Sequence, residues 1–241
     1  MKRQLLLIAV LLLSVTAFAQ NNEEVITADG NTVKEKRTIK QYSSLNVTGP
    51  FEVAITDSND NFVTLEGSQN IVSLIEVKEE NGTLSIQMPA HLKFKAHKKN
   101  KVYIKVPYST DLSAIKFNGA GSLTCRKTIK NNVIVKLEGP GSVKLDLYAA
   151  KSEASVLGSG SVTLKGAVQD FKCKIIGSGN IMADHLETSN MDVVVSGSGN
   201  AYLACTKTIK GNISGSGNVA FTGEPEHQDL KRSGSGDYSS F

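Results

Sequence analysis

The chain contains no tryptophan, and aromatic residues make up only 6% of its 241 positions. Proline is also scarce, with 5 residues against 21 glycines, and this composition excludes collagen-like and disordered classes in favour of many regular turns. The four histidines are scattered, and no cysteine or carboxylate stands at ligand spacing beside His91 and His97, the two that share one basic loop. We therefore expect no metal and no cofactor.

A long apolar run occurs only at the N-terminus, at Leu5–Leu13. Lys2 and Arg3 precede this run, and Ala17–Ala19 follows it as an A-x-A cleavage site. The run is too short to span a bilayer as a helix. We therefore predict a signal peptide at residues 1–19 and an exported mature chain without a transmembrane span. Because no cysteine directly follows the run, we expect no lipoprotein anchor.

The mature chain also lacks a strong charge bias. Loss of Lys2 and Arg3 lowers the 27 basic residues to 25, against 23 acidic ones, so the net charge is +2. This balance does not favour a polyanionic partner, and nucleic acid is a poor candidate for an exported protein. The length suits one large all-β domain or two small ones.

The abundant glycines recur as Gly-x-Gly at intervals of 18 to 20 residues. Apolar residues stand two and four places before the first glycine and four and six places after it, with polar residues between them. This alternation predicts two short, half-buried strands per repeat, and such repeats must stack to bury their inner faces. The sequence therefore predicts an all-β protein, a right-handed parallel β-helix with coils of about 19 residues.

The Gly-x-Gly corner is interpreted as architecture rather than as a ligand site. Glycine can adopt the positive φ that a corner requires, and the residue that follows the second glycine is a serine, asparagine or aspartate that can hydrogen-bond to its neighbours in adjacent coils. The predicted turn ladder comprises Gly158, Gly160, Gly177, Gly179, Asn180, Gly197, Gly199, Asn200, Gly215, Gly217 and Asn218.

Three cysteines are an odd number for an exported protein, and they could form one disulfide and leave one thiol. Cys125 and Cys173 fall on inward columns three coils apart, beyond the roughly 7 Å between Cα atoms that a disulfide tolerates. Cys205 lies in the coil after Cys173 but in another column. We expect all three to be small buried hydrophobic residues, with a reactive Cys205 as the alternative.

The N-terminal half follows the repeat less closely. After a loose segment at residues 20–37, Leu45, Val47, Val53 and Ile55 fit the template around Gly49, and Gly67 fits it partly. An Asn-Gly pair then predicts an antiparallel hairpin, and a further alternating strand follows. We predict a β-subdomain at residues 38–110 that is continuous with the solenoid and caps it, followed by the repeat β-helix at residues 111–241.

Several segments together resemble one known family. They are "LNVTGPFEVAIT", "TLSIQMP", "VYIKVP" and the corners "GSGSV" and "GSGN", which are similar to the head GIN domain family of auto-transporter adhesins. The resemblance covers roughly residues 38–241. It implies a β-helical fold and export in a Gram-negative bacterium, and it carries over no catalytic residues.

A polysaccharide lyase or hydrolase on a β-helix is the enzyme alternative. Such a site needs paired carboxylates or a cluster of a base and a cation on an outer face, and Glu153 and Asp192 share an outward column with Lys172 between them. We interpret this column as a salt-bridged, solvated face. Coils of 18–20 residues also leave no room for the long loops that wall a catalytic cleft.

One local excess of charge lies at residues 91–101. It comprises Lys93, Lys95, Lys98, Lys99 and Lys101, and it is either a site for an acidic polysaccharide or lipopolysaccharide phosphate, or a solvated loop that prevents edge pairing.

The sequence thus favours a non-catalytic binding or adhesion module, in the periplasm or on the outer cell surface, that contacts glycan or a surface protein. The alternatives are the carbohydrate-active enzyme and a structural protein that self-associates. An uncapped C-terminal coil would favour self-association.

Overall fold

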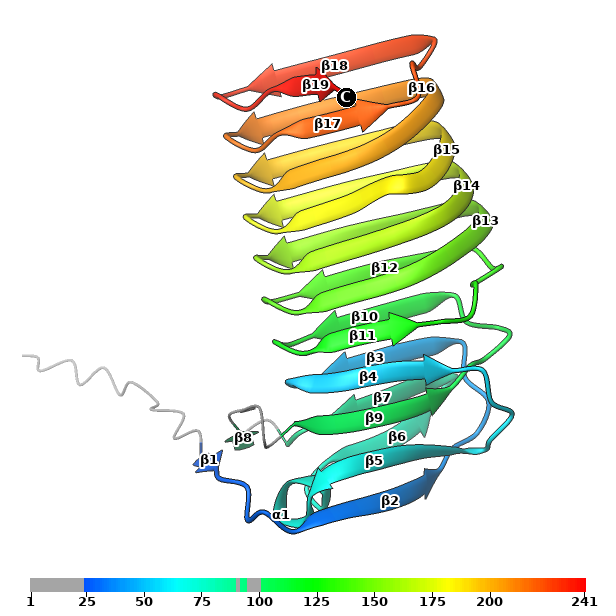
Figure 1. The fold of residues 1–241 in the computed structure, drawn as a ribbon, viewed down its shortest axis with the longest axis vertical. Helices are drawn as coiled ribbons and strands as arrows, with labels where there is room; N and C mark the ends of the chain where they lie inside the picture. Colours follow the sequence, from blue (N-terminus) through cyan, green and yellow to red (C-terminus); the bar gives the residue numbers. More distant parts are fainter. Residues whose placement is uncertain (1–23, 90–91, 95–100) are drawn as a thin grey trace, which may run out of the picture.

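The structure is a computed structural model that describes residues 24–89, 92–94 and 101–241. Figure 1 shows a single stack of coils in which almost every strand lies beside an equivalent strand of the next coil. The parallel β-helix predicted from the repeat is confirmed. Its solenoid strands are β10 (Ala114–Asn118), β11 (Ser122–Cys125), β12 (Val133–Glu138), β13 (Ser142–Gly158), β14 (Ser161–Gly177), β15 (Asn180–Gly197), β16 (Asn200–Gly215), β17 (Val219–Thr222), β18 (His227–Ser233) and β19 (Tyr238–Ser240).

Each coil is flattened into two strand segments that face each other. On one side the chain turns sharply at the glycine corner, and on the other side β13 to β16 run through a wide bend without interruption (Figure 1). The stacking is in register, since Ser142 pairs with Ser161 at one end of β13 and Gly158 pairs with Gly177 at the other. We call the layer that precedes each glycine corner sheet 1 and the layer that follows it sheet 2.

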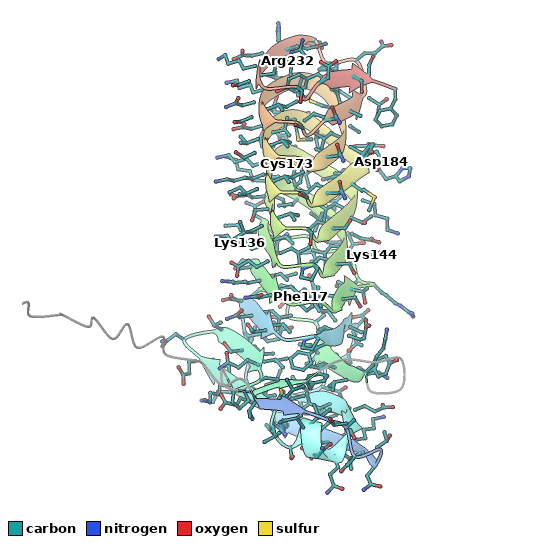
Figure 2. The ribbon with its side chains drawn as sticks, turned by 90° about the vertical axis from the view of Figure 1, so that its left-hand side faces the viewer. Phe117, Lys136, Lys144, Cys173, Asp184 and Arg232 are labelled. Carbon is teal, nitrogen blue, oxygen red and sulfur yellow. The ribbon has the colours of Figure 1, made fainter. Side chains whose placement is uncertain are left out.

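The core lies between the two sheets and consists of the inward columns. Phe117, Leu137, Val156 and Ile175, which stand two places before successive corners, are at most 1% exposed. Figure 2 shows Phe117 and Cys173 between the sheets. All three cysteines are free and buried, as the sequence predicted. Burial raises the pKa of the Cys205 thiol, which lowers its reactivity.

At most corners both glycines lie too close to the neighbouring coil for a side chain, and the first glycine also needs a positive φ, which is the one requirement that the sequence predicted. The first glycine adopts a positive φ, for example +121° at Gly197. The second glycine has no such φ, but a Cβ at Gly199 would lie 2.1 Å from the carbonyl oxygen of Gly179 in the coil below. The second glycine is therefore needed because the backbones of neighbouring coils approach too closely for a side chain.

The asparagines after the corners form the predicted ladder. The Asn200 side chain donates from Nδ2 to Oδ1 of Asn180 at 3.3 Å, and the Asn218 side chain donates in the same way to Asn200 at 3.2 Å. Each Oδ1 also accepts the backbone N–H of the next asparagine. The amide column therefore provides side-chain acceptors for backbone N–H groups at the corners, and the Asn200 N–H also donates to the carbonyl oxygen of Gly179.

The N-terminal half departs from simple stacking. It contains β1 (Glu24–Ile26), β2 (Thr32–Thr38), β3 (Ser44–Thr48), β4 (Phe51–Thr56), β5 (Phe62–Ser68), α1 (Gln69–Val72), β6 (Glu76–Glu80), β7 (Thr83–Gln87), β8 (Leu92–Phe94) and β9 (Val102–Pro107). The coil of β3 and β4 pairs on one side with β10 and β11, and on the other side with β7 and β9. The order of coils in space therefore differs from their order in the chain.

Antiparallel strands close this end of the stack. The predicted hairpin is present, because β6 pairs antiparallel with β7 through Asn81 and Gly82, both of which have positive φ. Strand β5 pairs antiparallel with β9 and β2. The partial fit of the repeat template around Gly67 was therefore wrong, because β5 runs against its neighbours and α1 follows it.

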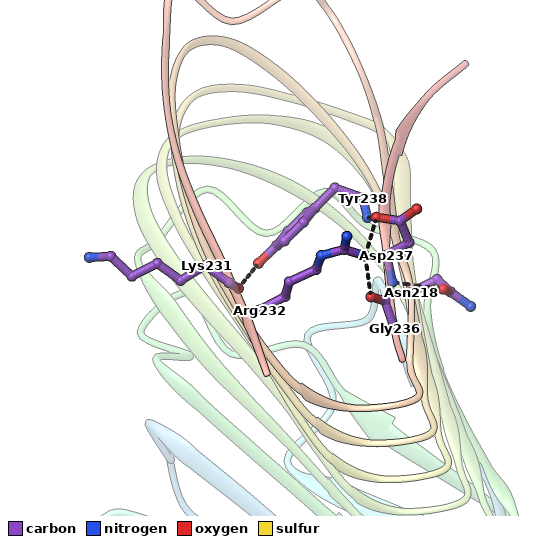
Figure 3. Close-up of polar contacts among 6 residues, drawn as sticks. All are labelled: Asn218, Lys231, Arg232, Gly236, Asp237 and Tyr238. Carbon is purple, nitrogen blue, oxygen red and sulfur yellow. Dashed lines mark hydrogen bonds and ion pairs between the residues drawn. The ribbon is translucent and has the colours of Figure 1, made fainter. Parts of the chain in front are cut away.

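The C-terminal coil carries its own cap, whereas the sequence left open an uncapped end. Arg232 and Tyr238 occupy columns that are apolar in the coils below, and Figure 3 shows both across the end of the coil. Arg232 donates to the Asp237 carboxylate at 3.0 Å, and the Tyr238 hydroxyl donates to the carbonyl oxygen of Lys231 at 2.8 Å. The outer strand β18 is polar and charged, which opposes pairing with another sheet edge. These features disfavour end-to-end association.

Candidate binding surfaces

The lysine-rich segment belongs to the chain between β7 and β9. Thr48 is in register with Gln87 and Phe51 with Val102, so two residues separate β3 from β4, whereas residues 88–101 separate the equivalent positions of β7 and β9 in the sequence. Lys95, Lys98 and Lys99 lie outside the described residues, and Lys93 is described only as part of β8. The predicted anion site at this segment stays a prediction.

Lys101 is the one lysine of this segment whose side chain the structure describes. Its ammonium group lies 2.6 Å from the Glu52 carboxylate on β4. Partial burial raises the pKa of the Glu52 carboxyl, but hydrogen bonds from Lys101 and Ser122 outweigh it, and the pKa lies below its usual value. Lys101 therefore already has an anionic partner within the chain.

A strip of uncharged outward positions lies on sheet 2 over the upper coils. The outward positions three and five places after the first glycine carry no charged residue from the coil of β14 to that of β17. Met182 and Tyr202 are 37% and 42% exposed within this face. We call these residues the uncharged strip: Ser161, Thr163, Asn180, Met182, Asn200, Tyr202, Asn218 and Ala220.

The uncharged strip is held rigidly. Strands β14, β15 and β16 bring its members into register, and the amide ladder joins three of them. Successive coils repeat at about 4.8 Å, so the strip presents side chains at regular intervals along the axis of the solenoid. Exposed apolar side chains beside amide groups form a surface suited to both stacking and hydrogen bonding.

A groove of about 900 Å³ runs along the outer edge of sheet 1. Its lining includes Glu153, Lys172 and Asp192, the column considered above for an active site, and these residues are in register in successive coils. No ion pair within 4.0 Å between described residues includes any of these three side chains. The salt bridges predicted for this column are therefore absent from the described part of the chain.

The two carboxylates of this column are arranged along one outer face of sheet 1. Glu153 and Asp192 are two coil steps apart, about 9.6 Å, on the same outer face with a lysine between them. A glycosidase places its carboxylates on either side of the scissile bond. In the described parts of the chain, no three His, Cys, Asp or Glu side chains are grouped so as to hold a metal ion.

Comparison with known proteins agrees with this architecture. Residues 41–225 match the family model described as "Putative auto-transporter adhesin, head GIN domain". The chain belongs to the head GIN domain family. No helix among the described residues of this head GIN domain protein is long and apolar enough to cross a membrane. A search of curated proteins found no match.

Solved structures share the fold of this head GIN domain protein. A putative adhesin from Bacteroides fragilis is 24% identical, with a TM-score of 0.78, and the match covers 88% of this chain and 97% of the other. Two proteins from Parabacteroides distasonis, named a putative lipid binding protein and a putative adhesin, are 20% and 22% identical with TM-scores of 0.74 and 0.71. Each of these two matches covers 90% of this chain and 100% of the other.

Sequence reasoning missed the uncharged strip of this head GIN domain protein. The signal was available, because Thr163, Met182, Tyr202 and Ala220 recur five places after the first glycine of each corner. A column of this kind stands out only when outward positions are compared between coils in the same way as inward ones.

Proposed function

We propose that this head GIN domain protein is an exported, non-catalytic binding module of the bacterial cell envelope that contacts glycan through the flat outer faces of its solenoid. The observation that carries the proposal is the uncharged strip. It combines exposed apolar side chains with a fixed row of amides, and extends over four coils from Ser161 to Ala220.

The uncharged strip is preorganised for binding. A ligand that lies along the strip meets side chains whose backbone is fixed by the parallel sheet, so little conformational entropy is lost on binding. Tyr202 supplies a rigid ring with a polar hydroxyl group, and such side chains are enriched where binding surfaces carry affinity. The name adhesin in the family description and in two of the structural relatives is consistent with a binding role.

The test is binding of the protein to a panel of neutral and acidic glycans, with a variant that carries Tyr202→Ala and Met182→Ala. We expect the double variant to bind at least about tenfold more weakly, because truncation of a hot-spot residue costs about 2 kcal/mol or more and Tyr202 is of the residue type enriched among hot spots. Tyr148→Ala is the matched control, since Tyr148 is 65% exposed and lies outside the strip. Equal binding by the double variant and the native protein would refute the role of the strip.

The same assay tests the lysine-rich segment and the enzyme alternative. Replacement of Lys93, Lys95, Lys98, Lys99 and Lys101 by alanine should abolish only a salt-sensitive component of binding to acidic glycans. Chain-length analysis of each glycan after incubation should reveal no cleavage. Shortened products would overturn the non-catalytic assignment.

A further inference from the structure

An outward column of sheet 1, three places before the first glycine of each corner, stacks like charges. Lys116 and Lys136 are directly in register, and Ser155 separates Lys136 from Lys174. Like charges on directly paired positions destabilise a sheet. The neighbouring column that contains Glu153, Lys172 and Asp192 alternates in sign instead. The basic column is therefore not explained by the stability of the stack.

Two of these lysines have no ion-pair partner among the described residues. Lys116 lies 3.0 Å from the Glu138 carboxylate, so its charge is offset within the chain. Lys136 and Lys174 are exposed, and neither takes part in an ion pair within 4.0 Å. Figure 2 shows Lys136 on the outer face of sheet 1, opposite Lys144 on sheet 2.

Ser155 creates a hollow between these two cations. A cavity of about 200 Å³ lies over it, and Lys136 and Lys174 line this cavity from the coils on either side. The Cα atoms of the two lysines are two coil steps apart, about 9.6 Å. Both ammonium groups can therefore reach one anion above Ser155, whose hydroxyl group supplies a third donor.

The hollow also has acidic and apolar walls. Glu138 and Glu153 line it; Glu138 is paired with Lys116, whereas Glu153 takes part in no ion pair between described residues and lies in the adjacent column, in register with Lys172 rather than with Ser155. Leu157 and Ile176 form the remaining wall, and they are 50% and 40% exposed. The two apolar side chains are in register with each other in the column next to the corner.

A surface that carries two exposed apolar side chains beside two lysine ammonium groups is complementary to an amphiphilic anion. We propose that the hollow above Ser155 binds the phosphate or sulfate group of an amphiphile, with Lys136 and Lys174 holding the anion and Leu157 and Ile176 contacting its alkyl chain. The site lies on sheet 1 and is separate from the uncharged strip on sheet 2, so it does not depend on the proposed glycan surface.

The test is calorimetric titration of the full-length mature protein with octyl phosphate, octyl sulfate, inorganic phosphate and the neutral octyl glucoside, each below its micelle concentration. We expect octyl phosphate or octyl sulfate to bind about tenfold more tightly than inorganic phosphate, which corresponds to burial of roughly two methylene groups. Octyl glucoside should bind far more weakly, because it leaves the two ammonium groups without a counter-charge.

Two double variants separate the parts of the site. Lys136→Ala with Lys174→Ala should weaken binding of the alkyl anion by about fivefold for each lysine. Leu157→Ser with Ile176→Ser should reduce octyl phosphate to the affinity of inorganic phosphate. Lys144→Ala is the matched control and should change nothing, since Lys144 is an exposed lysine on the opposite sheet.

The melting temperature of each variant distinguishes a lost anion site from a misfolded protein. The lysine double variant removes a like-charge repulsion, so its melting temperature should be equal to or above that of the native protein while its affinity falls. Native affinity in the lysine double variant, or an equal loss in Lys144→Ala, overturns the anion site. Equal affinity of the native protein for octyl phosphate and inorganic phosphate overturns the assignment of an amphiphile.

Discussion

Replacement of the second corner glycine, Gly199→Ala, tests the packing of the coils most directly. The added Cβ would lie 2.1 Å from the carbonyl oxygen of Gly179, and Cβ contacts below 3.0 Å are essentially never observed, so the two coils must separate by about 0.9 Å. Separation strains three backbone hydrogen bonds of the corner, from Ser198 and Gly199 to Gly177 and from Asn200 to Gly179, at 2.9, 3.0 and 3.2 Å. At about 1 kcal/mol for each bond, we expect a loss of about 3 kcal/mol in the free energy of unfolding.

Gly30→Ala is the matched control for this variant. Gly30 has a φ of +85°, but no atom would lie within 4 Å of its added Cβ. We expect this variant to lose about 1 kcal/mol, the cost of a side chain in the left-handed region. Urea unfolding followed by far-ultraviolet circular dichroism measures both losses. A loss in Gly199→Ala no larger than that in Gly30→Ala would refute the reasoning that contact between coils requires the second glycine of the corner.

Three further predictions concern the ladder, a buried thiol and the cap. Asn200→Ala leaves the Asn218 N–H without its side-chain acceptor and should lower the free energy of unfolding in urea by about 1–2 kcal/mol. Asn212→Ala is the control at an exposed position outside the ladder, and it should change this free energy by less than about 0.5 kcal/mol. Burial raises the pKa of the Cys173 thiol above its ordinary 9.0, so the thiol loses its proton at a lower pH in the unfolded chain than in the folded one. The free energy of unfolding should therefore fall above about pH 9, by up to about 1.4 kcal/mol per pH unit. Urea midpoints at about pH 8 and pH 10 check the fall, and a Cys173→Ala variant that declines equally would contradict it. Arg232→Leu removes the charged cap from the end of the core and should raise the apparent mass in light scattering as concentration increases, whereas an unchanged mass would show that the cap does not limit association.

The repeat carried most of the predictable information about the fold. Inward residues such as Leu137 and Val156 follow from alternation alone, because successive side chains of a strand point to opposite faces. The same period predicted that the corner asparagines lie in one column and that the three cysteines do not form a disulfide. The site was less predictable, because the lysine-rich segment drew attention through its composition whereas the uncharged strip and the hollow above Ser155 have ordinary compositions. Both become visible only when residues about 19 positions apart are placed side by side.

The sequence by itself determined the solenoid, its corners, its core and the N-terminal hairpin. Only the tertiary structure decided that the coil of β7 and β9 lies beneath that of β3 and β4, and that Arg232 and Tyr238 close the far end. Alternation and turn residues are local, so a sequence specifies them directly. The order of coils and the neighbours of each outward side chain depend on which strands pair across long stretches of chain, and that choice is made by the whole stack as it buries its inner faces.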